Sequence, residues 1–408
     1  MANKIAHSMA VKAGITTLCA VLAFLISGCS VSPGKNNFGG AASPTPTPLP
    51  SRMMVSDNTT GNVVVINAAT DAIITTVNVP SPGKLVSASG TTVIQSTLSN
   101  SVTIFDDASD TVRSTVTLPA IPVDIAITPD GKTAWVAENN GTVQSINTAT
   151  GAFTDTVVVA GVQRIALGPA GTTVLAFNDT VTTGYVAILP LPTQPVAVPG
   201  AGMDHPTNAI FADDNHFLQL NCGPECGGTQ AGVIGTTLTN AGASTLSTPL
   251  NLSGATVGLF SGTTAFIAGS PTTGLNAGTL QVVNAVGLST GAPISISDGH
   301  HGVMALTSNG KLYIGATGCT LGALNGQNQR QGCLTIFDTS TLVVTKVLVD
   351  ATRSTGDVTA LAPVPGRSVI YVAHGGVLDI FDITTGAVST TATRPTIPGT
   401  VSGITPMN

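Results

Sequence analysis

The sequence predicts an all-β protein, a β-propeller of four-stranded blades, and three observations lead to this fold class. The composition favours short strands joined by turns, a turn motif closes successive β-rich segments, and a glycine recurs before apolar segments. Counting the segments gives eight blades, with seven as the alternative if the degenerate unit at 216–240 is not a separate blade. The propeller is expected to span residues 51–408.

The composition is apolar and poorly charged. Hydrophobic residues make up 42% of the 408 residues, charged residues make up only 8%, and the formal net charge is -6. An average soluble domain has about 25% charged residues. Coiled coils, disordered activators and nucleic-acid binders depend on charge that this chain lacks. These classes are excluded, and no nucleic acid is expected as a partner.

The N-terminus has the features of an export signal. A basic start precedes an apolar segment at 13–26 that is short for a bilayer span, so residues 1–28 fit a cleaved signal peptide. The sequence Leu25-Ile26-Ser27-Gly28-Cys29 resembles the bacterial lipobox, although Ile26 stands where that pattern most often has Leu. The resemblance implies that Cys29 is acylated and anchors the protein to the bacterial envelope, on the outer membrane or its periplasmic side, with the cell surface also possible. The alternative is an ordinary secretory signal with an incidental cysteine.

Residues 29–50 form the predicted tether. The alternating prolines at 44–50 lack backbone donors and cannot continue a helix or a strand ladder. Such a segment behaves as a semi-rigid spacer of about 3.1 Å per residue. We therefore expect a propeller held at some distance from the lipid.

A short turn motif closes several β-rich segments. An Asn or Asp ends the segment and a Ser or Thr follows three residues later, so the first side chain can accept bonds from the backbone N–H groups ahead of it. The next residue often suits a positive φ, as Asp and Gly do, but Leu342 breaks this preference. The motif occurs at Asn67, Asp106, Asn147, Asp338 and Asp382.

A glycine marks a second turn in the repeat. It precedes an apolar segment each time, and Asn215 stands where one glycine is missing. Successive markers are 41, 40, 44, 47, 48 and 56 residues apart, the length of four short strands and their turns. The markers are Gly90, Gly131, Gly171, Asn215, Gly262, Gly310 and Gly366.

The order of the strands indicates how the ring closes. If the strands of a blade are labelled A to D from the centre outward, the chain enters at a B strand and leaves after an A-like strand at 400–405. This last strand can complete the first blade and remove two exposed sheet edges. Trp135, the only tryptophan, lies in a B strand and is expected in the core between blades. The expected B strands are 53–56, 91–96, 133–137, 172–177, 216–220, 263–268, 311–315 and 368–373.

Three segments, 54–67, 135–147 and 371–382, share one pattern: a short apolar strand, a loop, a second strand that ends in Ile or Phe before Asn or Asp, and the turn motif. They resemble the YVTN-type β-propeller family. No unit carries the literal tetrapeptide, and the units at about 190–290 match weakly. The resemblance implies a propeller and an exported binding or surface protein, without a shared catalytic set.

Four cysteines remain once the signal peptide and Cys29 are set aside. Of the three possible pairings, the sequence-local one is the most economical in an oxidising compartment: Cys222 with Cys226 and Cys319 with Cys333. Both pairs fall in expected B-to-C loops. A four-thiolate zinc site is the alternative, but neither the spacing nor the compartment favours it. We therefore expect two disulfides, no metal and no cofactor.

Histidines and carboxylates gather in loops that are predicted to share one face. In propeller topology the D-to-A and B-to-C loops surround the same end of the central channel, and four of the six histidines fall there. Imidazoles and carboxylates can bind a transition metal or act as acid and base, but these residues also favour loops because loops are solvated. No catalytic residue is assigned. The possible ligand face consists of Asp204, His205, Asp298, His300, His301, Asp357 and His374.

The leading hypothesis for function is a non-enzymatic, membrane-tethered propeller that binds a protein, a glycan or another envelope component with this face. Its basis is the tether, a rigid closed scaffold and long polar loops at 221–231, 269–278 and 317–332. A monomer is expected once the lipid is removed.

Two other function classes stay open. A propeller enzyme at the channel mouth, such as a lactonase-like hydrolase or a metal or quinone oxidoreductase, requires His300, His301 and His374 to converge. A surface-layer or adhesive structural protein requires self-association instead.

Overall fold

The computed structural model describes residues 51–178, 185–189, 196–199, 204–238, 244–271, 278–319, 332–348 and 357–407. These segments contain strands β1 to β34 and one short 3-10 helix, η1 (Gly223–Cys226). The described strands therefore confirm the all-β prediction. The predicted signal peptide, Cys29 and the tether at 29–50 lie outside the described residues.

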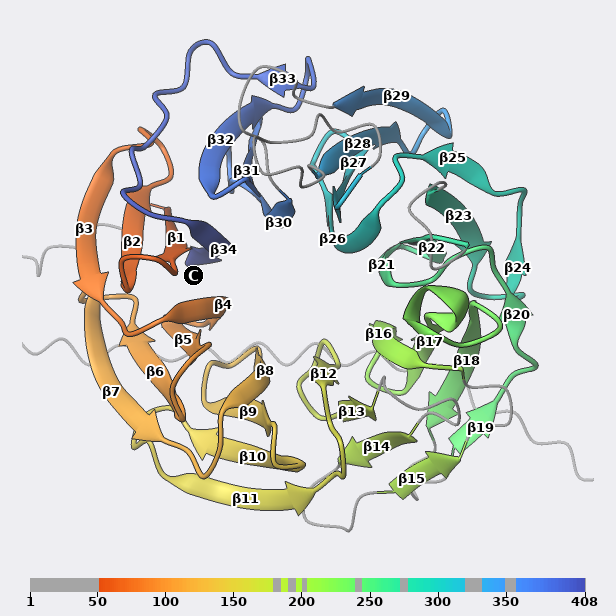
Figure 1. Ribbon diagram of the computed structural model, residues 1–408, viewed down its shortest axis with the longest axis horizontal. Coiled ribbons are helices and arrows are strands. Elements are labelled where there is room, and N and C mark those ends of the chain that lie inside the picture. Colours follow the sequence, from red (N-terminus) through yellow and green to blue (C-terminus); the bar gives the residue numbers. More distant parts are fainter. Residues whose placement is uncertain are drawn as a thin grey trace, which may run out of the picture. The chain divides into compact units, whose positions relative to one another are not determined.

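The described strands pair into eight antiparallel sheets that stand around a common centre as propeller blades (Figure 1). Each sheet has a path of four strands, as predicted, and each expected B strand overlaps the second strand of one sheet. Blade 1 combines the two ends of the propeller and consists of β34 (Val401–Met407), β1 (Arg52–Asp57), β2 (Asn62–Asn67) and β3 (Ile73–Asn78).

The next three blades follow in chain order. Blade 2 consists of β4 (Pro82–Ala88), β5 (Thr91–Ser96), β6 (Ser101–Asp106) and β7 (Thr111–Thr117). Blade 3 consists of β8 (Pro122–Ile127), β9 (Thr133–Glu138), β10 (Thr142–Asn147) and β11 (Phe153–Val158). Blade 4 consists of β12 (Arg164–Leu167), β13 (Val174–Asn178), β14 (Tyr185–Leu189) and β15 (Val196–Pro199).

Blades 5 and 6 have an outer strand that is interrupted into two pieces, both paired to the third strand. Blade 5 consists of β16 (Pro206–Asp213), β17 (His216–Asn221), β18 (Gly232–Leu238), β19 (Ser244–Leu246) and β20 (Leu250–Asn251). Blade 6 consists of β21 (Val257–Ser261), β22 (Thr264–Gly269), β23 (Gly278–Asn284), β24 (Ser289–Thr290) and β25 (Ile294–Ile296).

The last two blades return to the regular pattern. Blade 7 consists of β26 (His300–Leu306), β27 (Lys311–Thr317), β28 (Cys333–Asp338) and β29 (Val343–Leu348). Blade 8 consists of β30 (Val358–Pro363), β31 (Val369–His374), β32 (Val377–Asp382) and β33 (Ala387–Val388).

The ring closes through the C-terminal strand. β34 pairs antiparallel with β1, from Arg52 opposite Met407 to Asp57 opposite Val401, and so forms the innermost strand of blade 1. It also contacts the innermost strands of both neighbouring blades, β4 and β30. The predicted closure by a strand at 400–405 is confirmed.

Apolar side chains are buried between adjacent blades. Trp135 of β9, 3% exposed, packs with Ile165 and Val174 of blade 4, which confirms its predicted place in the core. The same kind of cluster joins blades 8 and 1, where Tyr371 packs with Met53 and other buried residues. Because burying one large apolar side chain contributes roughly 1.5–3 kcal/mol, these repeated interfaces hold the blades together.

The predicted turns are largely confirmed. The side chains of all five Asx residues accept backbone N–H bonds; in one of these turns Asn67 Oδ1 bonds Ala69 and Thr70 at 2.8 and 3.3 Å. Leu342, which breaks the sequence preference, nevertheless adopts φ 57 in the same turn. Asn215 lies in the turn between β16 and β17, as predicted. It is not among the described residues with positive φ, and Asp213 closes this turn by accepting the Asn215 N–H at 2.8 Å.

Candidate functional site

A cavity of about 940 Å³ opens at one end of the central channel. Its walls include residues from the innermost strand of every blade, and these strands surround the centre in Figure 1. The lining residues lie near the beginnings of those strands, for example Lys84 of β4, Asn208 of β16 and Thr359 of β30. The cavity is therefore the channel mouth on the face that the sequence analysis assigned to the D-to-A and B-to-C loops.

Bulges shape this mouth. The register of six described inner strands is interrupted within their first few residues, so that each carries residues without a partner on the next strand. A bulge bends the strand and redirects its side chains. The residues that line the cavity and have no opposite residue in the strand register include Lys84, Val123, Gly302, Thr359 and Ser402.

Three charged residues from consecutive blades line the channel mouth. Lys84 Nζ lies 2.6 Å from Asp124 Oδ1, and Asp124 Oδ2 accepts the N–H of Ile165 at 2.9 Å. Arg164 begins β12 beside them. Lys84, Asp124 and Arg164 are each 40 residues apart and occupy similar places in three repeats, a signal that the sequence analysis missed.

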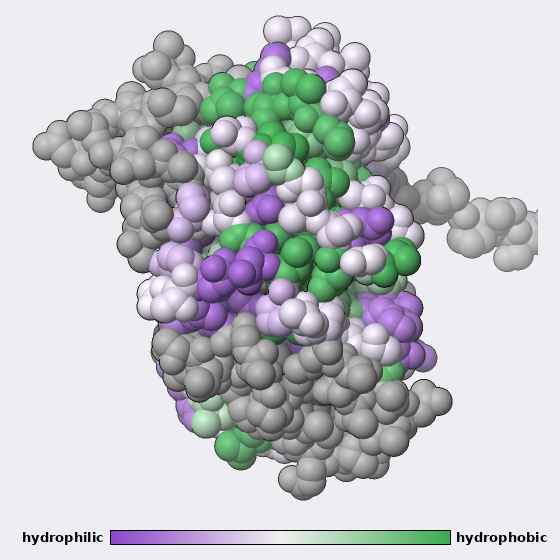
Figure 2. Space-filling view, turned by 90° about the vertical axis from the view of Figure 1, so that its right-hand side faces the viewer, coloured by the Kyte–Doolittle hydropathy of each residue, from purple (hydrophilic) through white to green (hydrophobic). Residues whose placement is uncertain are grey.

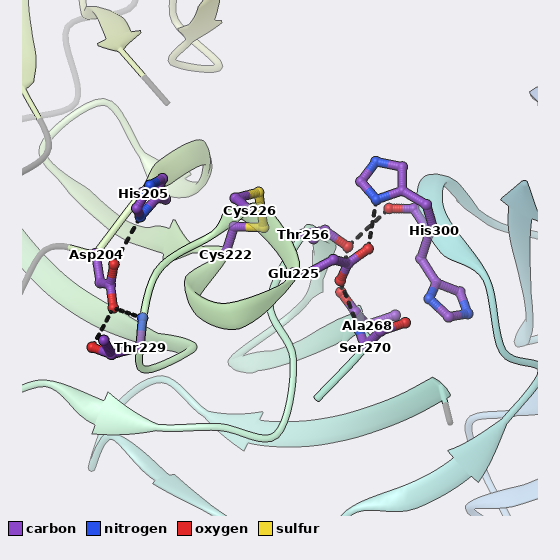
Figure 3. The surroundings of a disulfide bond; sticks show 11 residues. Asp204, His205, Cys222, Glu225, Cys226, Thr229, Thr256, Ala268, Ser270 and His300 are labelled. Atoms are coloured by element: carbon purple, nitrogen blue, oxygen red, sulfur yellow. Dashed lines mark hydrogen bonds and ion pairs between the residues drawn. A yellow bond between two sulfur atoms is a disulfide. The ribbon is translucent and has the colours of Figure 1, made fainter. Parts of the chain in front are cut away.

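Asp204 and His205, two predicted face residues, bond each other and the disulfide loop of blade 5 (Figure 3). His205 Nδ1 lies 2.8 Å from Asp204 Oδ1, and Asp204 Oδ2 accepts the N–H groups of Thr229 and Gln230 at 2.6 and 2.7 Å. Burial alone would raise the pKa of Asp204, but these hydrogen bonds outweigh it and lower the pKa to about 2. Asp204 is therefore ionised at neutral pH, and its carboxylate holds the loop through these hydrogen bonds.

This pKa gives a testable stability effect. Asp204→Asn should lower the free energy of unfolding by about 2 kcal/mol at pH 7, because one pKa unit corresponds to about 1.4 kcal/mol. The unfolded carboxyl titrates near 3.8 and the folded one near 2, so the stabilisation is complete above about pH 5 and is lost as the pH falls to 2. Urea midpoints of the two proteins, measured from pH 7 to pH 2, should converge at the acid end.

The matched control is the other Asp–His pair of blade 5. Asp213 and His216 also lie 2.9 Å apart, but both side chains are more than half exposed. Asp213→Asn should change the urea midpoint far less, because solvent screens an exposed pair. A gap between Asp204→Asn and the wild type that stays the same at pH 2 would mean that packing, and not charge, causes the loss.

Glu225 is the residue of this face that the sequence analysis missed. It lies in η1, between the two cysteines of the loop, and its side chain is only 7% exposed. Its carboxylate accepts the N–H of Ser270 in blade 6 at 2.7 Å and lies 2.5 Å from Nδ1 of His300 in blade 7 (Figure 3). One side chain thus joins three blades.

The other predicted histidines have separate local partners. His301 is fully buried, and its Nε2 donates to the carbonyl of Ser297 at 2.9 Å. Burial lowers its pKa, so the ring stays neutral, and its Nδ1 has no hydrogen-bond partner. His374 Nε2 instead lies 2.7 Å from Asp379 Oδ2, on its own blade.

The predicted ligand face is therefore a set of separate pairs. His300, His301 and His374 lie at the ends of strands β26 and β31, where loops were expected. Asp357 accepts the N–H of Gly318 at 2.8 Å. In the described part of the chain, one group has ligand atoms within 4.8 Å of one another: Asp298, Cys319 and Cys333.

Both predicted disulfides are present. Cys222 pairs with Cys226 and Cys319 with Cys333, with Cα atoms 5.6 and 5.9 Å apart. The sulfurs beside Asp298 are thus bonded to each other, which favours the disulfide over the zinc alternative. Disulfides indicate an oxidising environment of the kind that exported proteins meet. Among the described residues, no helix has the length and apolar character to span a membrane. Of the long loops, residues 272–277 and 320–331 lie outside the described ones.

The outer rim of the ring is a weaker candidate for a binding surface than the channel mouth. Figure 2 shows the side of the ring that carries β20, β24 and β25, where hydrophobic residues form separate groups among polar ones. A second cavity, of about 530 Å³, lies between blades 5 and 6 and is lined by Phe217, Phe260 and Leu288 among others. It involves two blades, whereas the channel mouth involves all of them.

No family model matches the chain, and no curated protein matches it. Several solved structures have a similar fold. Dihydro-heme d1 dehydrogenase NirN, solved in complex with DHE, gives a TM-score of 0.66 at 14% identity over 87% of this chain and 74% of that chain. The computationally designed protein Ika8 gives 0.60 at 13% identity, over 81% and 93% of the two chains. A functionally unknown protein from Desulfotomaculum acetoxidans gives 0.51 at 14% identity, over 87% and 98%. At these identities the likeness shows the propeller fold alone.

Proposed function

We propose that this protein is an exported binding module that holds its ligand at the mouth of the central channel. The observation that carries the proposal is the cavity of about 940 Å³, to which every blade contributes. Ligand sites in proteins are concave, of roughly 300–1,000 Å³, and largely preformed. A ring closed by its own C-terminal strand supplies such a preformed site.

The residues of the ligand face fit a supporting role in this proposal. Asp204 with His205, Glu225 with His300 and His374 with Asp379 each form a local pair. These pairs fix loops and strand ends around the mouth. A rigid scaffold that positions surrounding loops is typical of binding proteins.

The cellular location of the module is also part of the proposal. Acylation at Cys29 would anchor it to the bacterial envelope, and the segment at 29–50 would hold the propeller away from the lipid. In this arrangement a monomer would present the channel mouth to a small molecule, a glycan or a protein of the envelope. Mass spectrometry of the mature N-terminus for a diacylglyceryl group tests the anchor.

A steric plug tests the binding site. Gly302 is a bulge residue of β26 that lines the cavity, and a Cβ atom added there would meet nothing within 4 Å. Gly302→Trp should therefore place an indole in the channel mouth, because the wall leaves room for its Cβ atom. After incubation with the small-molecule fraction of a cell-envelope extract and gel filtration, mass spectrometry should find about tenfold less retained compound than on the wild type, because losing about 1.4 kcal/mol of binding changes affinity tenfold.

The control is Gly291→Trp, in the outer connection between β24 and β25, where an added Cβ also meets nothing within 4 Å. It should retain the same compound as the wild type. Equal retention by Gly302→Trp, or no retained compound on any of the three proteins, would overturn the proposal.

A further inference from the structure

We infer that the ligand of the channel mouth is a small organic anion, whose carboxylate or phosphate group lies between Lys84 and Arg164. The inference rests on the proposed function and names the chemical class of its ligand. Three properties of the mouth carry it: the placement of its charges, the charge of the rest of the protein and the size of the cavity.

The first property is that the cationic groups of the mouth are more exposed than its carboxylate. The charged residues among the described lining are Lys84, Asp124 and Arg164. The Asp124 side chain is 12% exposed and already accepts the backbone N–H of Ile125 and of Ile165, each at 2.9 Å. The Lys84 side chain is 46% exposed, and Arg164 is exposed as well. The two cations are therefore more accessible to an incoming molecule than the carboxylate, although Lys84 is paired with Asp124 at 2.6 Å.

The second property is the contrast with the chain as a whole, whose formal net charge is -6. A cleft with low-dielectric walls focuses the field of the charges that line it. A small anion is attracted to the mouth, whereas a long polyanion such as a nucleic acid is repelled by the surrounding acidic surface. Stability offers no strong reason for Lys84, because its half-exposed ion pair with Asp124 contributes about 1 kcal/mol or less.

The third property is the size and lining of the mouth. About 940 Å³ is at the upper end for small-molecule sites. Gln163, Asn208 and Thr359 add neutral hydrogen-bonding groups to the wall, and Ile165 and Ile404 add apolar surface. Such a wall suits an organic anion that carries hydroxyl groups, as a sugar acid or a sugar phosphate does.

The test uses chloride as a probe of the anion site and organic anions as competitors. The ³⁵Cl NMR line of a chloride solution should broaden on addition of the protein. Citrate and glucose 6-phosphate should remove the extra broadening at low concentration, and glucose should not. Lys84→Gln with Arg164→Gln should weaken the binding of both organic anions about tenfold or more, because a charge-assisted hydrogen bond contributes about 1.5–3 kcal/mol.

Two further variants make the result specific. Lys132→Gln removes an exposed charge from a distant turn and should leave the broadening unchanged. Asp124→Asn should strengthen anion binding, because it removes the one negative charge of the described lining. Broadening that is equal in the wild type and the double variant, or that organic anions fail to displace, would overturn the inference. If either of these results is found but Gly302→Trp still loses its retained ligand, the anion inference fails and the proposed binding function is kept.

Discussion

A chain that ends at Thr400 should not fold into a stable propeller. It lacks β34, which forms the inner strand of blade 1 and pairs along the whole of β1. All six residues of β1 are buried, so the deletion exposes an apolar edge and leaves its backbone N–H and C=O groups without partners. Val401 and Met407 are themselves buried, and burying each such side chain contributes roughly 1.5–3 kcal/mol. The total loss is about 5–10 kcal/mol, which approaches the whole stability of a typical domain.

Thermal unfolding followed by circular dichroism and light scattering measures this effect. The shortened chain should show no cooperative transition, or one tens of degrees lower, and should aggregate through the open edge. A chain that ends at Met407 keeps all of β34 and should behave as the full-length protein does. If the chain ending at Thr400 melts cooperatively at the wild-type temperature, closure by β34 does not hold the ring.

Asp71→Ala should cause the second large loss, about 3–5 kcal/mol, which is the usual cost of breaking a buried ion pair by removing one partner. Asp71, in the turn between β2 and β3, binds Arg367 of blade 8 through both of its carboxylate oxygens, and its Oδ1 accepts the Tyr371 hydroxyl at 2.6 Å. Burial, together with the Asp71 carboxylate, raises the pKa of Tyr371, so the phenol stays protonated and donates. The substitution leaves the Arg367 guanidinium with the Ala68 carbonyl but without its carboxylate, and leaves the buried Tyr371 hydroxyl without its acceptor, at the junction between the first and last blades.

Asp110→Ala is the matched control, because Asp110 also sits in a turn with positive φ and binds Arg52 of the preceding blade. In each pair the arginine keeps one backbone carbonyl, Asp107 for Arg52 and Ala68 for Arg367. The two pairs differ in the carboxylate, because the Asp110 side chain is 21% exposed and the Asp71 side chain 3%. Backbone strain is therefore similar in the two variants, and the loss at Asp110 should be clearly smaller. Asn tolerates a positive φ, so in urea unfolding Asp71→Asn should lose less stability than Asp71→Ala and more than Asp110→Ala. Equal losses for Asp71→Ala and Asp110→Ala would show that the network with Tyr371 adds nothing.

Local features of the fold were predictable because they depend on a few neighbouring residues. An Asx side chain bonds the N–H groups two and three residues ahead, so the turn at Asn67 follows from its own sequence. Leu342 and Asn215 depart from the residue types that these turns usually carry. The chain forces Leu342 into the left-handed region because the flanking strands are paired, and Asp213 replaces the missing glycine by another set of hydrogen bonds.

The site was predictable only in part. The sequence placed histidines and carboxylates around one end of the channel, but it left open whether they act together. The Glu225 carboxylate is the hydrogen-bond partner of His300 from two blades away, and the Asp379 carboxylate is that of His374 within one blade. Such pairings depend on side-chain distances across the ring, which one sequence does not contain.

The sequence by itself determined the architecture, the paired cysteines and the closing strand, because turn chemistry, repeat length and hydrophobic strands act over short stretches of chain. Only the tertiary structure decided which groups meet at the channel mouth. Lys84, Asp124 and Arg164 are 40 residues apart in sequence and line one cavity because each lies near the beginning of the inner strand of its blade, in three consecutive blades. Their encounter depends on the way the blades pack around the axis, which the whole chain sets collectively.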